Sequence, residues 1–326
     1  MIRNIQALRA IASLMVVAHH VVGAALTYHP QTRYLDFFYG WGACGVDIFF
    51  VISGFVMVYT QSHRPKSPLQ FFGNRVARIA PTYWAITTLM LLIFVVHPAT
   101  FQSVQFSAGR ALRSFLFVSV PFDGGPLVYV GWTLEYEMLF YVIFAASIFI
   151  GNPVWSRLAC IAAFGVLALA GLTMPLEFLF GMVAANIVVR FPKLPIGIPC
   201  LLLGVGLLLA TIPLGAVDDH TRFIRWGIPA FLIVLGALYI PQTSSRIALY
   251  LGAASYSIYL AQIFSISGFY KLVSRPLSGM NGDILAVACI GASAALGCLV
   301  YETVEGPADK LIRRYRKRTM AQVAAA

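Results

Sequence analysis

The chain has 326 residues, of which 60% are hydrophobic and only 11% are charged. Soluble globular domains carry about 25% charged residues, so this composition excludes an ordinary soluble enzyme and predicts a polytopic membrane protein. The formal net charge of +11 at pH 7 would also suit a nucleic-acid-binding protein. In so hydrophobic a chain, basic residues in loops explain this charge better, and no nucleic-acid partner is expected.

Ten apolar segments are candidates for transmembrane helices, since a helix that crosses the hydrocarbon needs about 20 mostly apolar residues. They predict an all-α, polytopic membrane helix bundle with about ten transmembrane helices. The segment 111–121 is too short to cross and is expected to be re-entrant or packed on the protein. The predicted spans are 10–28, 43–60, 79–97, 134–150, 158–174, 175–189, 195–216, 226–240, 247–269 and 284–301.

An even number of spans places both termini on one side of the membrane. With the termini in the cytoplasm, the inner segments carry roughly twice as many Lys and Arg residues as the outer segments, as the positive-inside rule predicts. Arg222 and Arg225 then belong to an outer segment. The chain divides into a transmembrane domain, 1–309, and a basic cytoplasmic tail, 310–326, that is expected to contact anionic lipid. The length of the first apolar run argues against a cleaved signal peptide.

Ionisable residues within membrane segments are costly and usually functional. Nearly all of them lie in the first 140 residues, and the second half offers only Glu177, near a span end. Chemistry is therefore expected in the first half, with the remainder as scaffold or acceptor groove. The five cysteines form no CxxC pair and have no His at metal-ligand spacing, so neither a metal site nor a redox role is expected.

The first predicted helix carries a polar stripe. At about 100° per residue, His20 lies only about 20° away from Arg9 around the helix, and Ser13 and Gln6 fall within about 60° of Arg9. His19 lies on the other side of the stripe. The stripe therefore favours His20 over His19 as a functional residue, although a buried His hydrogen-bonded to a neighbouring helix is an alternative interpretation.

The next span begins near Asp47 and carries Ser53 and Gly54 at mid-helix. Two adjacent small residues let two helices approach each other closely. A helix-packing role and a site-lining role remain equally open for this segment.

Arg75 and Arg78 are one helical turn apart at the predicted cytoplasmic surface, with Arg64 and Lys66 nearby. Residues at i and i+3 face the same side of a helix, and Arg makes bidentate contacts with phosphate groups. The pair predicts a site for a phosphorylated cytosolic ligand. Anchoring to lipid headgroups is an equally good interpretation of the spacing alone.

Two carboxylates follow Trp132 at the outer start of a predicted span, at Glu135 and Glu137. Residues at i and i+2 point about 200° apart on a helix, so these carboxylates cannot form one paired site. One of them could neutralise an Arg or a protonated His elsewhere in the bundle. The other would then be a helix-start carboxylate favoured by the helix dipole.

Together these motifs resemble the acyltransferase-3 family of membrane acyltransferases, most closely its ExoZ-like exopolysaccharide O-acetyltransferases. The resemblance runs almost end to end, and its blocks are individually weak but specific in their order. The usual His two residues after the SYxxYL block is replaced by Gln262. In chain order, the motifs fall on Arg9 and His20, on Gly45, Asp47, Phe49, Phe50, Ser53, Gly54 and Phe55, on Arg75, Arg78 and Pro81, on Trp132, Thr133, Leu134 and Glu137, on Ser255, Tyr256, Tyr259 and Leu260, and on Glu305 and Pro307.

The resemblance implies an integral-membrane O-acyltransferase of the bacterial inner (cytoplasmic) membrane. It would move an acyl group, usually acetyl, from cytosolic acyl-CoA to a hydroxyl of an exopolysaccharide or other cell-surface glycan precursor, with acetyl-CoA as donor substrate and no bound cofactor or metal. His20 would be the catalytic base or a transient acyl carrier, since imidazole titrates near neutral pH. Arg9 and Glu137 would support catalysis and Arg75 and Arg78 would bind acyl-CoA. The further site-lining residues would be Asp47, Ser53, Trp132 and Tyr256.

A transporter or flippase for a lipid-linked saccharide is the alternative interpretation. Secondary transporters commonly show internal repeats with broken helices in matching halves. No such repeat is visible, and the polar groups gather in one half of the chain. This asymmetry favours an enzyme.

Overall fold

The computed structural model describes residues 2–28, 32–97, 106–122, 125–215, 217–273, 276 and 279–325. Over these residues the secondary structure is helical and contains no strand, which confirms the predicted all-α class. The α-helices are α1 (Arg3–Tyr28), α2 (Phe38–Trp41), α3 (Gly45–His63), α4 (Pro68–Val96), α5 (Ala108–Leu116), α6 (Trp132–Ile148), α7 (Pro153–Leu169), α8 (Pro175–Arg190), α9 (Gly197–Ala210), α10 (Asp219–Arg222), α11 (Ile228–Tyr239), α12 (Arg246–Val273), α13 (Gly282–Val300) and α14 (Gly306–Ala325).

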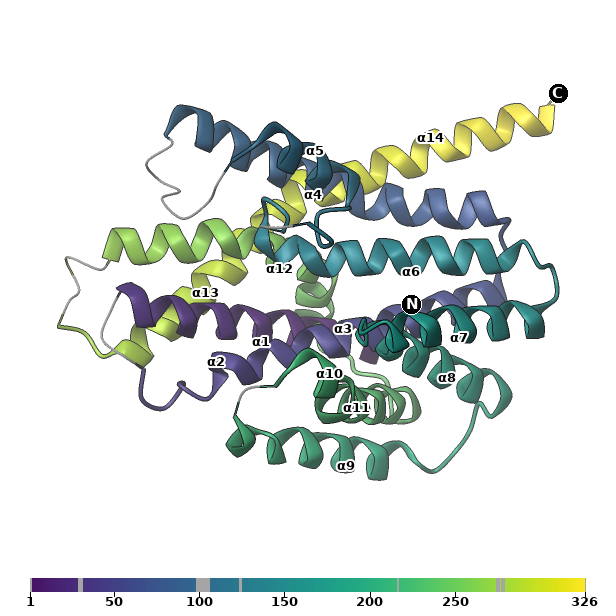
Figure 1. Cartoon of the computed structure of the whole chain (residues 1–326), viewed down its shortest axis with the longest axis horizontal. Helices are drawn as coiled ribbons and strands as arrows, with labels where there is room; N and C mark the ends of the chain where they lie inside the picture. The colour runs from purple at the N-terminus through teal and green to yellow at the C-terminus, as the bar shows by residue number, and fades with distance from the viewer. Residues whose placement is uncertain are drawn as a thin grey trace.

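Most of the long helices run roughly parallel or antiparallel to one another, and α14 projects from the bundle towards the C-terminus (Figure 1). In the described ranges, seven helical segments are long and apolar enough to cross a membrane. Helices α6, α7 and α8 coincide with three further predicted spans but have only 17, 17 and 16 residues. The multi-pass bundle is thus supported, whereas the count of ten crossings and the cytoplasmic termini stay predictions.

Polar caps begin several helices at the positions where the chain leaves a loop. Ser67 accepts a hydrogen bond from the backbone N–H of Gln70 at the start of α4, and Asn152 caps α7 in the same way. In both helices a proline follows the cap, where its missing N–H costs nothing because the first N–H groups lack helical partners. These caps define where two of the apolar helices start.

The segment expected to be too short to cross forms α5, a helix of nine residues. It lies beside α4 (Figure 1), and the indole N–H of Trp84 on α4 donates to the carbonyl oxygen of Phe115 at 2.9 Å. The structure thus confirms that this segment packs on the protein.

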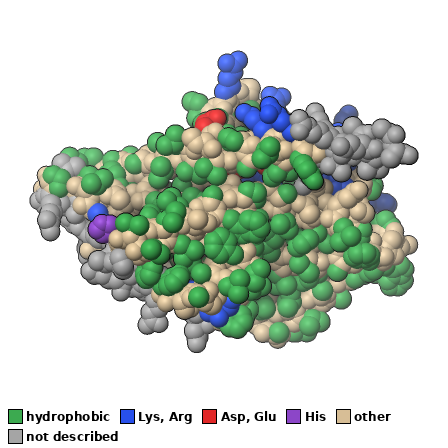
Figure 2. Space-filling view, turned by 90° about the horizontal axis from the view of Figure 1, so that it is seen from above, with side chains coloured by type: hydrophobic (Ala, Val, Ile, Leu, Met, Phe, Trp, Pro, Cys, Tyr) green, Lys and Arg blue, Asp and Glu red, His purple; other side chains and the backbone are tan. Residues whose placement is uncertain are grey.

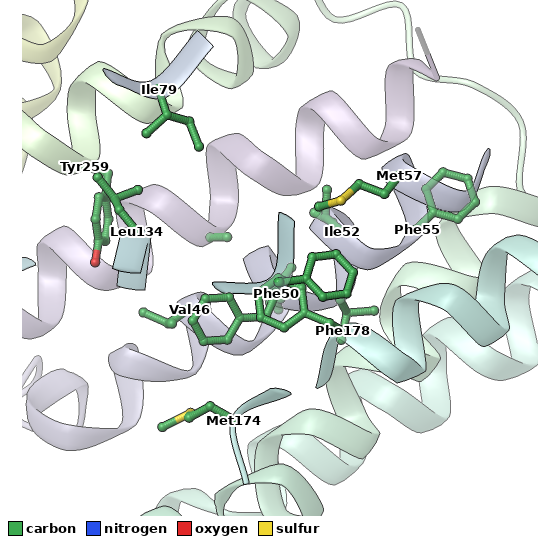
Figure 3. Close-up of a cluster of buried hydrophobic side chains, with 14 of the residues drawn as sticks. Val46, Phe50, Ile52, Phe55, Met57, Ile79, Leu134, Met174, Phe178 and Tyr259 are labelled. Carbon is green, nitrogen blue, oxygen red and sulfur yellow. The ribbon is translucent and has the colours of Figure 1, made fainter. Parts of the chain in front are cut away.

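Helices α3 and α8 approach closely because each places a glycine at the contact. A Cβ atom added to Gly54 would lie 2.1 Å from the carbonyl oxygen of Phe178, and one added to Gly181 would lie 2.0 Å from that of Val51. Beside this contact, Phe50 packs on Phe178 with 4.7 Å between ring centroids (Figure 3). The small residues of α3 therefore have a packing role, one of the two interpretations that the sequence left open.

The outer surface of the bundle is hydrophobic. The face in Figure 2 is covered mainly by hydrophobic side chains, with its Lys and Arg side chains near the margins. Side chains that a soluble protein would bury, such as Leu92, Val95 and Leu169, are 58%, 72% and 91% exposed. Such a surface suits a lipid environment.

Substituting Gly54→Ala should lower the free energy of unfolding by about 1–3 kcal/mol, because the added methyl group meets backbone atoms that cannot rotate away. Gly165→Ala on α7 is the matched control. Its Cβ would meet nothing within 4 Å, so stability should rise by about 0.5–1 kcal/mol from the lower backbone entropy of the unfolded chain. Thermal unfolding of the purified variants in one detergent measures both effects, and equal stabilities would contradict the packing assignment.

Candidate active site

A cavity of about 520 Å³ opens between helices from both halves of the chain. Helices α1, α3, α4, α6 and α12 each contribute to its lining. This volume falls in the usual range for small-molecule sites, about 300–1,000 Å³. The polar residues among those that line it are Arg9, Ser53, Tyr59, Thr60, Arg75, Arg78, Thr133, Glu137, Tyr141, Ser255, Tyr256 and Tyr259.

Three guanidinium groups face this cavity. Arg75 donates to Thr60 Oγ1 at 3.3 Å and lies over the ring of Tyr141, 5.8 Å from its centroid. Arg9 and Arg78 make no hydrogen bond or ion pair with any residue that the structure describes. The cavity therefore gathers positive charge, which is the arrangement that an anionic ligand requires.

Glu137 is the acidic residue among the cavity-lining residues. Its Oε1 accepts hydrogen bonds from the hydroxyls of Ser53 at 2.6 Å and Tyr141 at 2.5 Å. The carboxylate also interacts electrostatically with Arg9 and Arg75. Glu137 thus offsets part of the positive charge of the three arginines and leaves a net positive charge.

The other carboxylate of this segment, Glu135, points to a different environment. Its Oε2 accepts a hydrogen bond from the backbone N–H of Val120 at 2.6 Å, in the segment that follows α5. The predicted divergence of Glu135 and Glu137 is therefore confirmed. Glu135 ties the α5 segment to the start of α6 and takes no part in the cavity lining.

The second half of the chain also contributes to the surroundings of this cavity, in a family motif that the sequence contains. Tyr256 lines it and donates its hydroxyl to the carbonyl oxygen of Ile79 at 2.8 Å. Buried Glu305 accepts a hydrogen bond from Ser257 at 2.6 Å and interacts electrostatically with Arg9 and Arg78. The family motifs name both residues, but the local charge pattern does not single them out, because Tyr256 reaches the cavity from α12 and Glu305 lies in the segment Tyr301–Glu305.

His20 lies outside the cavity lining, although Arg9 on the same helix faces the cavity. The half-buried His20 ring packs edge-on against Tyr129, with centroids 5.1 Å apart, and makes no hydrogen bond to the described part of the chain. Its neighbour His19 accepts a hydrogen bond from the backbone N–H of Gly40 at 2.9 Å. The two histidines thus differ in their partners, and His20 keeps its ring nitrogens available.

A hydrogen-bonded group lies between the cavity and the surroundings of His20. Thr133 and Tyr259, which line the cavity, bond to each other at 2.8 Å. The Tyr259 hydroxyl also lies 2.8 Å from the carbonyl oxygen of Val130, and Val130 directly follows Tyr129, which contacts His20. This group therefore connects the two places where the sequence predicts chemistry.

Asp47 and Trp132 belong to a separate cluster around Arg222, a residue of a predicted outer segment. Arg222 is buried and forms a bidentate ion pair with Asp47, with N–O distances of 3.0 and 2.9 Å. Its guanidinium lies 6.0 Å from the ring centroid of Trp132. Fully buried Glu177 interacts electrostatically with both charged groups. Burial of Arg222 follows from a partner 175 residues away, which local sequence does not disclose.

Gln262, which replaces the His usual in the family motif, is buried in α12. Its amide Nε2 donates to the carbonyl oxygen of Tyr259 at 2.8 Å, within the same helix. No group of three or more His, Cys, Asp or Glu side chains that could hold a metal ion occurs in the described ranges. The residues that line the cavity support the binding of an anion next to hydroxyl and carboxylate groups.

Comparison with known proteins adds the family. A family model described as an acyltransferase domain matches residues 2–303. The chain is 33% identical to the exopolysaccharide production protein ExoZ of Rhizobium meliloti (strain 1021) over 300 residues, covering 85% of this chain and 92% of that protein.

A second relative is the peptidoglycan O-acetyltransferase OatA of Listeria monocytogenes serovar 1/2a. It is 29% identical over 167 residues, which are 45% of this chain and 24% of that protein. No solved structure matches the chain. Because the family model covers nearly the whole helical bundle, the chain belongs to the acyltransferase-3 family of membrane acyltransferases.

Proposed function

We propose that the protein is an acyl-CoA-dependent O-acetyltransferase of the bacterial inner membrane that acetylates a hydroxyl of an exopolysaccharide or other cell-surface glycan precursor. The observation that carries this proposal is the cavity in which Arg9, Arg75 and Arg78 converge. Membership of the acyltransferase-3 family supports the reaction type, and the exopolysaccharide production protein among the relatives supports the acceptor class.

The cavity suits acetyl-CoA because this donor combines several phosphate groups with a flexible apolar arm. Guanidinium groups bind phosphate oxygens through paired hydrogen bonds, and these hydrogen bonds are stronger where water is excluded. Arg75 and Arg78 lie at the predicted cytoplasmic end, where cytosolic acetyl-CoA would enter. The apolar part of the lining, which includes Phe49, Phe50 and Ile52, would enclose the pantetheine arm and limit hydrolysis of the thioester.

His20 is proposed as the general base. The acceptor hydroxyl oxygen attacks the thioester carbonyl carbon, and His20 takes the hydroxyl proton as the new C–O bond forms. The C–S bond then breaks, and the CoA thiolate that leaves takes up the proton that His20 accepted, so that His20 is neutral again. Because His20 and Arg9 are eleven residues apart on α1, about 16 Å along the helix axis, the thioester end must reach past Thr133 and Tyr259.

A direct assay tests the function. Membranes that contain the protein are incubated with labelled acetyl-CoA and a panel of lipid-linked and free glycans, and glycan-bound label is measured. We expect label on at least one glycan, and no label with membranes that lack the protein. Movement of a lipid-linked saccharide without any dependence on acetyl-CoA would refute the enzyme and establish the transporter alternative.

The variants Arg75→Ala and Arg78→Ala should each raise KM for acetyl-CoA about tenfold, because a charge-assisted hydrogen bond to phosphate contributes about 1.5–3 kcal/mol and about 1.4 kcal/mol corresponds to tenfold. The rate at saturating acetyl-CoA should change little. Arg246→Ala, which removes an exposed charge at the start of α12 outside the cavity lining, is the control. Unchanged KM values in both cavity variants would remove the phosphate-binding role.

A further inference from the structure

A second cavity of about 490 Å³ adjoins the first. Both cavities are lined by Ile2 and Tyr59, so they meet at the start of α1 and near the end of α3. The second cavity also receives Arg3, His63 and Gln242. All of these residues lie in segments that the charge pattern assigns to the cytoplasmic side.

An aromatic row on α3 runs from one cavity into the other. Phe55 stacks on Tyr59 with ring centroids 5.2 Å apart, and Tyr59 packs on His63 with centroids 4.2 Å apart. Phe55 lines the first cavity, His63 the second, and Tyr59 both. His63 Nδ1 lies 2.9 Å from the carbonyl oxygen of Tyr59, which fixes the ring and leaves Nε2 directed away from the helix backbone.

The charge of the second cavity is positive. Arg3 is exposed and makes no hydrogen bond or ion pair to the part of the chain that the structure describes. No acidic side chain is among the residues that line this cavity. A ligand with a planar aromatic group and an anionic group therefore fits better here than a neutral or cationic one.

We propose that the second cavity binds the adenosine 3′-phosphate end of acyl-CoA. This inference rests on the proposed function. The base would stack on His63 at the end of the aromatic row, with the 3′-phosphate near Arg3. The diphosphate would then lie at the junction of the cavities, near Arg75 and Arg78, and the pantetheine arm would follow the first cavity towards Thr133 and Tyr259.

The continuity of the two cavities favours a nucleotide over a lipid headgroup. A headgroup phosphate would account for Arg3 alone. It would not use an aromatic row that leads from the second cavity into the arginine-rich first cavity, whereas one acyl-CoA molecule has a planar base, phosphates and a flexible arm in the order that the cavities require.

The test compares two donors that differ only in the nucleotide. Arg3→Ala and His63→Ala are purified as full chains in lipid nanodiscs and assayed with acetyl-CoA and with S-acetylpantetheine, which lacks the nucleotide. Each variant should raise KM for acetyl-CoA about tenfold and leave KM for S-acetylpantetheine unchanged. Inhibition of the wild type by adenosine 3′,5′-bisphosphate should weaken by a similar factor in both variants, and Arg246→Ala should change none of these values.

Each outcome tests either the nucleotide site in the second cavity or the proposed function. If the wild type transfers acetyl from acetyl-CoA but the variants alter both donors equally, or alter neither, the second cavity does not hold the nucleotide. An altered dependence on anionic lipid together with an unchanged KM for acetyl-CoA would assign it to a lipid headgroup and overturn the inference. If the wild type does not use acetyl-CoA at all, the proposed function fails first.

Discussion

The variant His20→Ala should lower the rate of acetyl transfer by about 10²–10⁴-fold, the usual contribution of a general base. KM for acetyl-CoA should change little, because His20 is not among the residues that line the arginine-rich cavity. The effect on stability should be small as well, since the half-buried ring makes no hydrogen bond to the described part of the chain. Rates with labelled acetyl-CoA and the best glycan acceptor measure the loss.

The adjacent His19 is the matched control. It accepts a hydrogen bond from the Gly40 N–H and stacks on Tyr39, with ring centroids 5.8 Å apart. We therefore expect His19→Ala to loosen the segment before α3 and to lower the rate far less than His20→Ala. Equal losses in the two variants would argue for a shared structural role, and normal transfer by His20→Ala would remove the proposed base.

The sequence predicts the helical architecture well because hydrophobic length is a local property. Helix α5 is short for the same reason. Its apolar run is short, and Ser107 caps its start, so that the helix has only nine residues. Boundaries are less local. Helix α4, which contains most of the span predicted at 79–97, starts eleven residues earlier, at Pro68, because the residues before the apolar run are helical as well.

The cavity shows which site residues sequence can identify. Arg75 and Arg78 stand one turn apart and both face the cavity, so a periodicity argument reaches them. Glu137 could be distinguished from Glu135 only by the family motif, since both carboxylates start the same helix. Ser255 and Tyr256 carry no charge, so only the family motif points to them, and their place in the lining depends on how α12 packs against α1.

The position of His20 shows a second limit. The angular argument places Arg9 and His20 on one stripe of α1, and Gln6 and Ser13 of that stripe are buried. Angle alone does not say that a hydrogen-bonded pair, Thr133 and Tyr259, lies between the cavity and the surroundings of His20. Whether all residues of the polar stripe on α1 face the same cavity depends on the neighbouring helices.

Removing either partner of the buried Asp47–Arg222 pair should destabilise the protein by about 3–5 kcal/mol, because the remaining charge is left buried without its counter-ion. Asp47 is fully buried, and the Arg222 side chain is only 10% exposed. Arg222 also lies 4.9 Å from the ring centroid of Trp226 and donates to the carbonyl oxygen of Ala43 at 3.0 Å. Chemical or thermal unfolding in one detergent measures the losses.

The two single variants should not be equal, because Glu177 lies in the same cluster. Glu177 is fully buried beside the pair and interacts with both Asp47 and Arg222. In Asp47→Ala the guanidinium still has one carboxylate nearby. In Arg222→Ala two carboxylates share a buried site with no cation, so this variant should lie at the upper end of the range.

Replacing Glu177, the third member of the cluster, distinguishes the electrostatic contribution to stability from the contribution of packing. Glu177→Gln keeps the shape of the side chain and removes its ionisable carboxyl group, so Arg222→Ala/Glu177→Gln should be more stable than Arg222→Ala alone. The double variant Asp47→Ala/Arg222→Ala should likewise lose less than the sum of its single variants, with a coupling of about 1–3 kcal/mol for side chains in direct contact. Additive losses in both double variants would contradict an electrostatic cluster and leave only the packing of Arg222 between Trp132 and Trp226 to account for the destabilisation.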